Sequence, residues 1–177
     1  MFERRVMTVM IGMVGLTVWL AGADPAAGGA TTRIASGGDV IEMEIPSDVG
    51  MQKETLPLYR SGTIHYFSAG IGLVEREAAY PPFPLKLVFT AGGKSFVTGV
   101  EVVLRRSKSA TVLTVPREHV TGPWLFIDVP DGTYEVAATL GGQIQQVKGI
   151  DVRRGHITTQ HVRWAEDRSP ALPPQAE

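Results

Sequence analysis

The stretch GPWLFIDVPDGTY, residues 122–134, decides the fold that we predict for this chain. Aliphatic side chains occupy every second position from 125 to 129, and Trp124 and Phe126 lie between them. This two-residue period is typical of a strand, here with one aliphatic and one aromatic face. We therefore expect a core strand at this point.

A tight turn is predicted directly after this strand. Pro130, Asp131 and Gly132 supply a fixed φ, a side chain that bonds its own backbone and a position without Cβ. These residues predict a type I turn that is closed by a left-handed residue. Tyr134 then begins the return strand, and its hydroxyl needs a hydrogen-bond partner if the ring is buried.

The return strand leads into a second hairpin. Residues 134–140 and 143–152 flank a Gly-Gly pair, which is the signal for a two-residue turn. A slip of one residue would move buried valines into water, so the register is well specified. The predicted facing pairs are Val136 with Val147, Tyr134 with Gly149, and Glu135 with Lys148.

Other short strands occur at near-regular spacing, with glycine and proline turns between them and no long amphipathic helix. They are predicted at residues 39–45 (an edge strand or clamp), 63–67, 85–90, 95–97, 100–104, 111–115 and 156–164. Their aliphatic faces must be buried against one another, because each exposed side chain of this kind would forfeit about 1.5–3 kcal/mol. The sequence therefore predicts an all-β fold, an antiparallel β-sandwich of about seven strands.

The composition fits one β-rich domain. The chain has 177 residues, 44% of them hydrophobic, with 20 glycines and 12 prolines. It contains no cysteine, which excludes disulfides, thiolate metal sites, a cysteine nucleophile and a lipid anchor on cysteine. It contains no asparagine, so N-glycosylation is excluded as well. A net charge of −1 gives no electrostatic reason to expect nucleic acid as a partner.

The N-terminus has the pattern of an export signal. Arg4 and Arg5 precede an apolar run over residues 6–20, and the sequence AGA at 21–23 offers a cleavage site. We expect residues 1–23 to form a signal helix that is removed, which predicts a periplasmic or secreted protein. The alternative is an uncleaved membrane anchor, since the run is near the lower length for a spanning helix.

Three further segments flank the expected sandwich. Residues 24–62 are predicted to be flexible or loosely packed, with a loop at 46–62 that holds Leu56, Leu58 and Tyr59 as anchors. Residues 63–83 form a lead segment with a short strand and a helical turn. The tail, residues 165–177, is expected to be disordered.

Several of these runs resemble a known family. They are PLKLVF at 84–89, VEVVL at 100–104, GPWLFIDVPDGTYEVAAT at 122–139 and HVRW at 161–164. Together they resemble the carboxypeptidase regulatory-like, or transthyretin-like, β-sandwich, which assigns that domain to residues 84–164. The run from Gly70 is also similar to small exported bacterial proteins of unknown function, whose lead segment carries Gly-Ile-Gly and Glu-Arg.

The resemblance covers about residues 65–164 and has two departures. Ala69 stands where relatives often have another glycine, and the basic run at 105–108 replaces a neutral turn. What the resemblance implies is a periplasmic or secreted domain. It carries no catalytic residue over to this chain.

The histidines do not have the spacing of a metal site. His156 and His161 are five residues apart on a predicted strand, which places them on opposite faces. His65 and His119 are isolated in the sequence. We therefore expect no metal and no cofactor.

The sequence also lacks the motifs of catalysis. It has no G-x-S-x-G elbow and no H-E-x-x-H pair, and no helix follows its glycine pairs to hold phosphate. Asp128 and Asp131 flank a turn, where aspartate usually acts as a structural acceptor. A carboxylate pair for glycoside hydrolysis would depend on their separation in space. We expect no catalytic residue and no enzyme, and a hydrolase ranks third among the hypotheses.

Binding is the favoured function class, and the lead segment holds the candidates. The candidate binding residues are Gly70, Gly72, Glu75, Arg76, Tyr80 and Phe83. The first hypothesis is an exported module that binds a protein or cell-envelope partner. The second is a small-ligand or carbohydrate-binding protein in which Tyr80, Phe83 and Trp124 stack on the ligand.

Each of these candidates also has a structural interpretation. Aromatic residues next to prolines can clamp the entry to the sandwich, and Glu75 and Arg76 can form an ion pair or a cap. The basic loop at 105–108, with Arg153 and Arg154, can meet an anionic envelope polymer or be a solvated turn. Structural roles are expected for Trp124, Pro130, Gly132, Tyr134 and Trp164.

Overall fold

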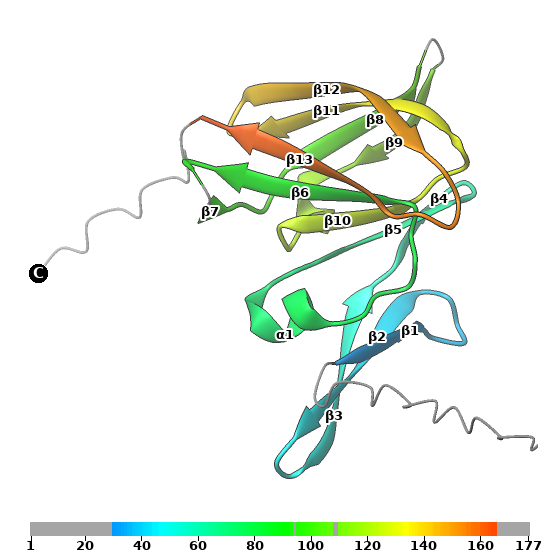
Figure 1. Ribbon diagram of the computed structural model, residues 1–177, viewed down its shortest axis with the longest axis vertical. Helices are drawn as coiled ribbons and strands as arrows, with labels where there is room; N and C mark the ends of the chain where they lie inside the picture. Colours follow the sequence, from blue (N-terminus) through cyan, green and yellow to red (C-terminus); the bar gives the residue numbers. More distant parts are fainter. Residues whose placement is uncertain (1–29, 94, 108–109, 166–177) are drawn as a thin grey trace, which may run out of the picture.

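The computed structural model describes residues 30–93, 95–107 and 110–165. Within these ranges the chain forms thirteen strands, one six-residue α-helix and one 3-10 turn. The strands make three sheets that are stacked in layers (Figure 1). The all-β sandwich predicted from the sequence is thereby confirmed. The expected signal helix at 1–23 and the tail beyond Ala165 lie outside the described residues.

The upper layer in Figure 1 is an antiparallel four-stranded sheet. Its strands, in spatial order, are β12 (Gln143–Val152), β11 (Gly132–Leu140), β8 (Glu101–Arg106) and β9 (Thr111–Val115). A six-stranded sheet packs below it. Its strands are β13 (Thr158–Trp164), β6 (Leu85–Ala91), β10 (Trp124–Asp128), β5 (Ile64–Ala69) and β4 (Tyr59–Ser61), and β7 (Ser95–Phe96) pairs with β6.

Two features of the sandwich differ from the expectation. Strand β13 pairs with β6 in parallel, so the six-stranded sheet is mixed rather than purely antiparallel. The two packed sheets also contain more than about seven strands, because short pieces such as β4 and β7 join their edges.

The lowest layer consists of an N-terminal sheet and the short helix α1 (Gly72–Glu77). The strands of this sheet are β1 (Thr31–Ile34), β2 (Val40–Ser47) and β3 (Gly50–Pro57), with β2 in the centre. The loop predicted at 46–62 and the edge position predicted for 39–45 are therefore wrong. Strand β3 is polar and almost entirely exposed, so it has no apolar alternation, and only its pairing with β2 makes it a strand.

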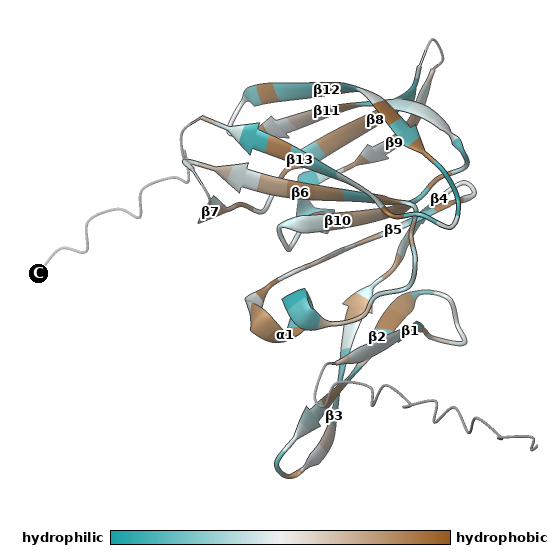
Figure 2. Ribbon diagram, in the orientation of Figure 1, coloured by the Kyte–Doolittle hydropathy of each residue, from teal (hydrophilic) through white to brown (hydrophobic). Residues whose placement is uncertain are grey.

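The main core lies between the four-stranded and six-stranded sheets. Leu125, Ile127 and Val129 are fully buried there, as their alternation predicts. Leu85 and Leu87 from β6 and other aliphatic residues from β8 and β11 complete it. Figure 2 shows hydrophobic residues along β6, β8 and β10 and many hydrophilic ones along β12. No helix in the described part of the chain is long and apolar enough to cross a membrane.

The turn after β10 is held by side-chain and backbone hydrogen bonds. The buried Tyr134 hydroxyl donates to the Pro130 carbonyl oxygen at 2.7 Å, which supplies the predicted partner. The Asp131 carboxylate accepts the Arg154 amide at 2.8 Å, a structural role. Gly132 has a φ of +159° and opens β11, so it does not close the turn in the left-handed conformation that was predicted.

The register of the second hairpin is confirmed at the turn and shifted further along. Leu140 pairs with Gln143, and Val136 faces Val147 as predicted. Tyr134, however, pairs with Ile150 instead of Gly149. The cause is a β-bulge in which Gly149 adopts a φ of +70°. Sequence alternation alone does not reveal one extra residue of this kind.

The first residue of the deciding stretch needs to be glycine for steric reasons. A Cβ built on Gly122 would lie 2.2 Å from the Ala69 carbonyl oxygen, which belongs to strand β5. The Ser68 hydroxyl also holds Gly122 against β5, because it accepts a hydrogen bond from the Gly122 amide at 2.8 Å. The central strand and β5 therefore approach each other closely where β10 begins.

We expect Gly122→Ala to lower the free energy of unfolding by about 3 kcal/mol, because the new methyl group must push β5 and β10 apart. Gly37→Ala is the control, since a Cβ there would meet only the flexible Asp39 carboxylate, at 3.1 Å. Urea unfolding of both variants measures the difference. Equal stability of the two variants would contradict the close approach.

Candidate functional site

The outer face of the six-stranded sheet is covered by aromatic rings. The stacked rings of Phe67 and Phe126, from β5 and β10, have centroids 4.7 Å apart. Phe83 packs edge-on against Phe67 at 5.1 Å, and Tyr80 lies 5.1 Å from Phe126. Together with Ile41 from β2 these rings form a second core. The lead segment and the N-terminal sheet therefore cover the aromatic face of the central strand.

Glu75 holds the beginning of α1. Its Oε2 accepts the Gly70 amide at 2.7 Å and the Ile71 amide at 3.0 Å. Arg76 does not pair with it; the guanidinium instead lies over the Phe96 ring, 5.5 Å from its centroid. Of the two roles considered for Glu75, the geometry is that of a cap.

Gly70 fits closely against the central strand. It has a φ of +100°, and a Cβ there would lie 3.0 Å from Cδ2 of Trp124 and 3.3 Å from Cγ of Pro123. Gly72 also has a positive φ, +74°, but the space around it is open. Gly70 therefore brings the lead segment into contact with Trp124, whereas Gly72 only lets the backbone turn into α1.

A pocket of about 290 Å³ lies between the lead segment and the sheet. We name it the Lys86 pocket. Its lining includes Arg76, Tyr80, Lys86, Trp124, Phe126 and Thr159. In the sheet, Lys86 stands between Phe126 of β10 and Thr159 of the edge strand β13, which places it on the outer face near one edge of the sheet.

The charged and polar groups of the Lys86 pocket have unusual surroundings. The Lys86 Nζ lies 3.3 Å from the centroid of the Trp124 ring and 5.2 Å from that of Phe126. Burial lowers the pKa of the Lys86 ammonium. The Tyr80 hydroxyl is buried without a hydrogen-bond partner among the described residues. Burial and, after it, the charge of Glu75 raise the pKa of Tyr80.

The structure brings only some of the candidate residues together. Arg76 and Tyr80 line the Lys86 pocket with Trp124, for which the sequence suggested a structural role. Phe83 is buried in the second core and does not line it. Gly70, Gly72 and Glu75 shape the backbone nearby. Trp164 is buried in the main core, and its Nε1 donates to the Gln143 carbonyl oxygen at 3.2 Å.

Lys86 is the residue that the sequence reasoning missed. It alternates with Leu85 and Leu87, which face the main core. The same alternation puts Lys86 on the outer face, beside the aromatic side of β10. Comparing the outer faces of β6 and β10 would have identified Lys86, but the sequence does not show that these two strands are neighbours.

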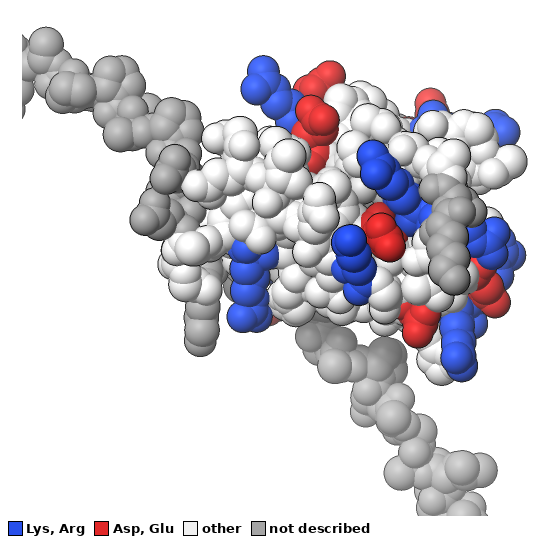
Figure 3. Space-filling view, turned by 90° about the horizontal axis from the view of Figure 1, so that it is seen from above, with Lys and Arg blue, Asp and Glu red and all other residues white. Residues whose placement is uncertain are grey.

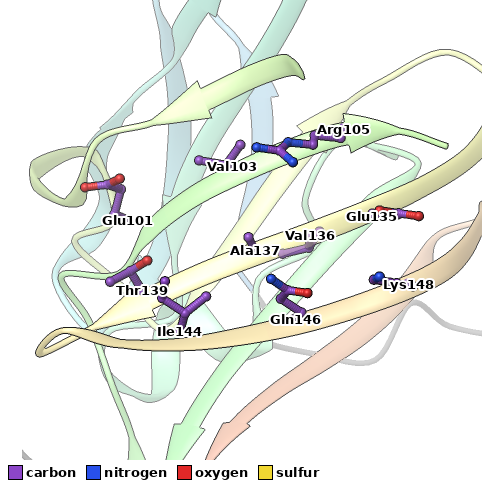
Figure 4. Close-up of a pocket in the computed structure, with 10 residues that line it drawn as sticks. All are labelled: Glu101, Val103, Arg105, Glu135, Val136, Ala137, Thr139, Ile144, Gln146 and Lys148. Atoms are coloured by element: carbon purple, nitrogen blue, oxygen red, sulfur yellow. The ribbon is translucent and has the colours of Figure 1, made fainter. Parts of the chain in front are cut away.

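A larger hollow of about 390 Å³ lies on the opposite side of the molecule, over β8, β11 and β12 (Figure 4). Glu101, Arg105, Glu135 and Lys148 line it, with no aromatic side chain among its described lining residues. Figure 3 shows that positive and negative side chains are interspersed over the face seen from above. This mixed surface is typical of a solvated sheet face rather than a recognition site.

The basic run at 105–108 does not form one loop. Arg105 and Arg106 belong to β8, and the Arg106 Nη2 donates to the Asp131 carbonyl oxygen at 3.0 Å. Lys108 lies outside the described residues. Arg106 is therefore engaged in holding the turn after β10.

Of the histidines, His119 takes part in packing, whereas His156 and His161 are exposed. The His119 ring stacks on Tyr59 with centroids 3.7 Å apart, and its Nδ1 lies 3.0 Å from the Tyr66 hydroxyl. Over the ranges that the structure describes, no three histidine, aspartate or glutamate side chains are grouped as metal ligands.

Comparison of the chain with protein-family models, curated proteins and solved structures gives no significant match. The resemblance to the carboxypeptidase regulatory-like sandwich therefore stays a prediction. The case for a functional site rests on the geometry of this chain.

We expect Glu75→Ala to lower the free energy of unfolding by about 1–2 kcal/mol, because two amides lose a charged acceptor. Glu77→Ala, an exposed position on the same helix, is the matched control and should change stability by less than about 0.5 kcal/mol. Urea unfolding gives the stabilities, and hydrogen exchange at Gly70 and Ile71 reports the cap. Unchanged exchange in Glu75→Ala would contradict the capping role.

Proposed function

We propose that this protein is an exported, non-enzymatic β-sandwich module that binds a protein partner through its lead segment. The observation that carries the proposal is the exposed apolar surface of α1. This helix buries none of its residues, and Leu73 is 63% exposed, with Ile71 and Val74 also exposed beside it. Contiguous apolar surface on a soluble domain is typical of an interaction site.

A second apolar side chain extends this surface beyond the helix. Phe96 of β7 is 46% exposed, and the Arg76 guanidinium over its ring connects it with α1. We refer to Ile71, Leu73, Val74 and Phe96 as the lead-segment patch. A fitting partner offers an apolar surface with an acidic group placed to meet Arg76.

The helix that carries the patch is held in place before any partner binds. Six residues are too few for an isolated helix to persist in water. Here the Glu75 cap and the contact of Gly70 with Trp124 fix it on the sandwich. Binding would therefore cost little ordering entropy, which favours affinity.

The location outside the cytoplasm is supported by the sequence pattern at residues 1–23 alone. A partner in the cell envelope or outside the cell follows from that pattern. The absence of the catalytic motifs from the sequence supports a binding role over an enzymatic one.

Carbohydrate stacking, the other binding hypothesis, is less well supported by the geometry. Phe83 is buried in the second core, and the Lys86 ammonium lies over the Trp124 ring on which a sugar would stack. Of the three aromatic rings on which a sugar was expected to stack, those of Phe83 and Trp124 are thus already covered.

The proposal predicts that Leu73→Asp abolishes capture of the protein partner, because a charge in the patch cannot be desolvated against an apolar surface. The full chain, tagged at its C-terminus, would be crosslinked in cells, and the captured protein identified and its Kd measured with purified components. Ile144→Asp is the control, because Ile144 is 60% exposed but lies on the outer face of the four-stranded sheet.

The expected result is a partner lost with Leu73→Asp and kept with Ile144→Asp. Both positions are exposed, so both variants should fold with nearly wild-type stability. Capture that is equal in both variants would refute the lead-segment patch as the binding surface.

A further inference from the structure

The Lys86 pocket combines two cations with no acidic lining residue. Arg76 and Lys86 both line it, and no aspartate or glutamate does so among the described residues. The nearest acidic neighbour in the chain, Glu75, already accepts two amides. The ion pairs of the described chain all lie in the N-terminal sheet, around Arg33 and Lys53. The pocket is therefore positively charged.

The position of Lys86 is costly for a lysine. Its side chain stands on β6, which is paired on both sides, and the ammonium is partly withdrawn from water. The Trp124 ring offsets part of this cost through a cation–π contact. An aromatic ring does not accept the ammonium hydrogen bonds as an oxygen would, and no acceptor for them is found in the described residues. An anion would supply that acceptor.

Tyr80 also lines this pocket, and its hydroxyl is a second donor without a partner among the residues that the structure describes. Its hydroxyl is buried and unpaired within the described chain, a state that native proteins rarely retain without reason. Because the environment keeps the phenol neutral, the hydroxyl remains a donor. Lys86 and Tyr80 thus both line the pocket with donors that have no acceptor among the described side chains.

The remaining wall is apolar and the volume is small. Ile157, 48% exposed, lines the pocket together with the Phe126 ring. A volume of about 290 Å³ is near the lower end for small-molecule sites. The space suits a compound with one ring or a short chain, with the apolar part against Ile157 and the charged part at the cations.

We propose that the Lys86 pocket binds a small organic anion, with a carboxylate at Lys86 and Arg76 and an apolar body against Ile157 and Phe126. This inference does not rest on the proposed binding of a protein partner. It uses the sheet side of the lead segment, whereas the partner is assigned to the exposed patch of α1, and the two surfaces share Arg76.

The test compares benzoate with its neutral isostere benzamide on the purified full chain. Binding is followed by NMR, using the indole N–H of Trp124 and the amide signals of β6, and each titration gives a Kd. Benzoate should bind at least about tenfold more tightly than benzamide, because only the carboxylate carries a negative charge and can form ion-paired hydrogen bonds with the two cations. Phenyl phosphate serves as a third probe, and tighter binding than benzoate would identify a phosphate rather than a carboxylate as the preferred anionic group.

Lys86→Met removes the charge and keeps an apolar stem over Trp124. It should weaken benzoate binding at least about tenfold and leave benzamide binding unchanged. Arg76→Gln, at an exposed position, tests the second cation if Lys86→Met fails to fold. Lys148→Met, on the outer face of the four-stranded sheet, is the control and should bind benzoate like the wild type.

Three results would overturn the inference. They are equal affinity for benzoate and benzamide, benzoate affinity unaffected by the loss of Lys86 or Arg76, and no shift at Trp124 up to the solubility limit of benzoate. Leu73→Asp should retain benzoate binding. A failure of the lead-segment patch can therefore be told apart from a failure of the pocket.

Discussion

Burial of the central strand on both faces is the constraint on which the rest of this structure depends. Toward the four-stranded sheet, Leu125 and Ile127 enter the main core; on the other side, Trp124 and Phe126 face away from it. A sandwich alone would leave those two rings in water. The N-terminal sheet and the lead segment bury the Phe126 ring and cover part of the Trp124 ring, which makes a third layer part of the fold rather than an appendage.

The same constraint explains how the candidate site arises. A short helix and a proline-rich turn cover the aromatic rings on the outer face of the six-stranded sheet. Because these two segments do not follow the regular spacing of the strands, they leave a gap at the margin of the covered area. Lys86 projects into that gap from β6, and Arg76 reaches it from α1. The pocket is thus formed where regular and irregular layers meet, and its charge comes from two elements with no common sequence motif.

Residues 122–134, the Gly-Gly hairpin and the near-regular spacing of the other short strands predicted the sandwich, because alternation and turn chemistry act over short distances. The N-terminal sheet was missed since β3 has no apolar period and becomes a strand only beside β2. The bulge at Gly149 was missed because the prediction used alternation alone, although a glycine inside a strand is a local signal for a bulge. For the site, Arg76 and Tyr80 were predicted because they belong to the unusual lead segment. Lys86 could not be predicted without knowing which strands are neighbours.

The parallel pairing of β13 with β6 has a consequence for the order in which the protein can fold. The partner of β6 on this edge is the last strand of the described residues, so the register from Thr158 opposite Leu85 to Trp164 opposite Ala91 forms only after the other strands of the sandwich have been synthesised. Until then the main core lacks Val162 and Trp164. The edge of the six-stranded sheet is therefore closed by a contact between segments far apart in the sequence, a kind of pairing that forms slowly because the loop that it closes is long.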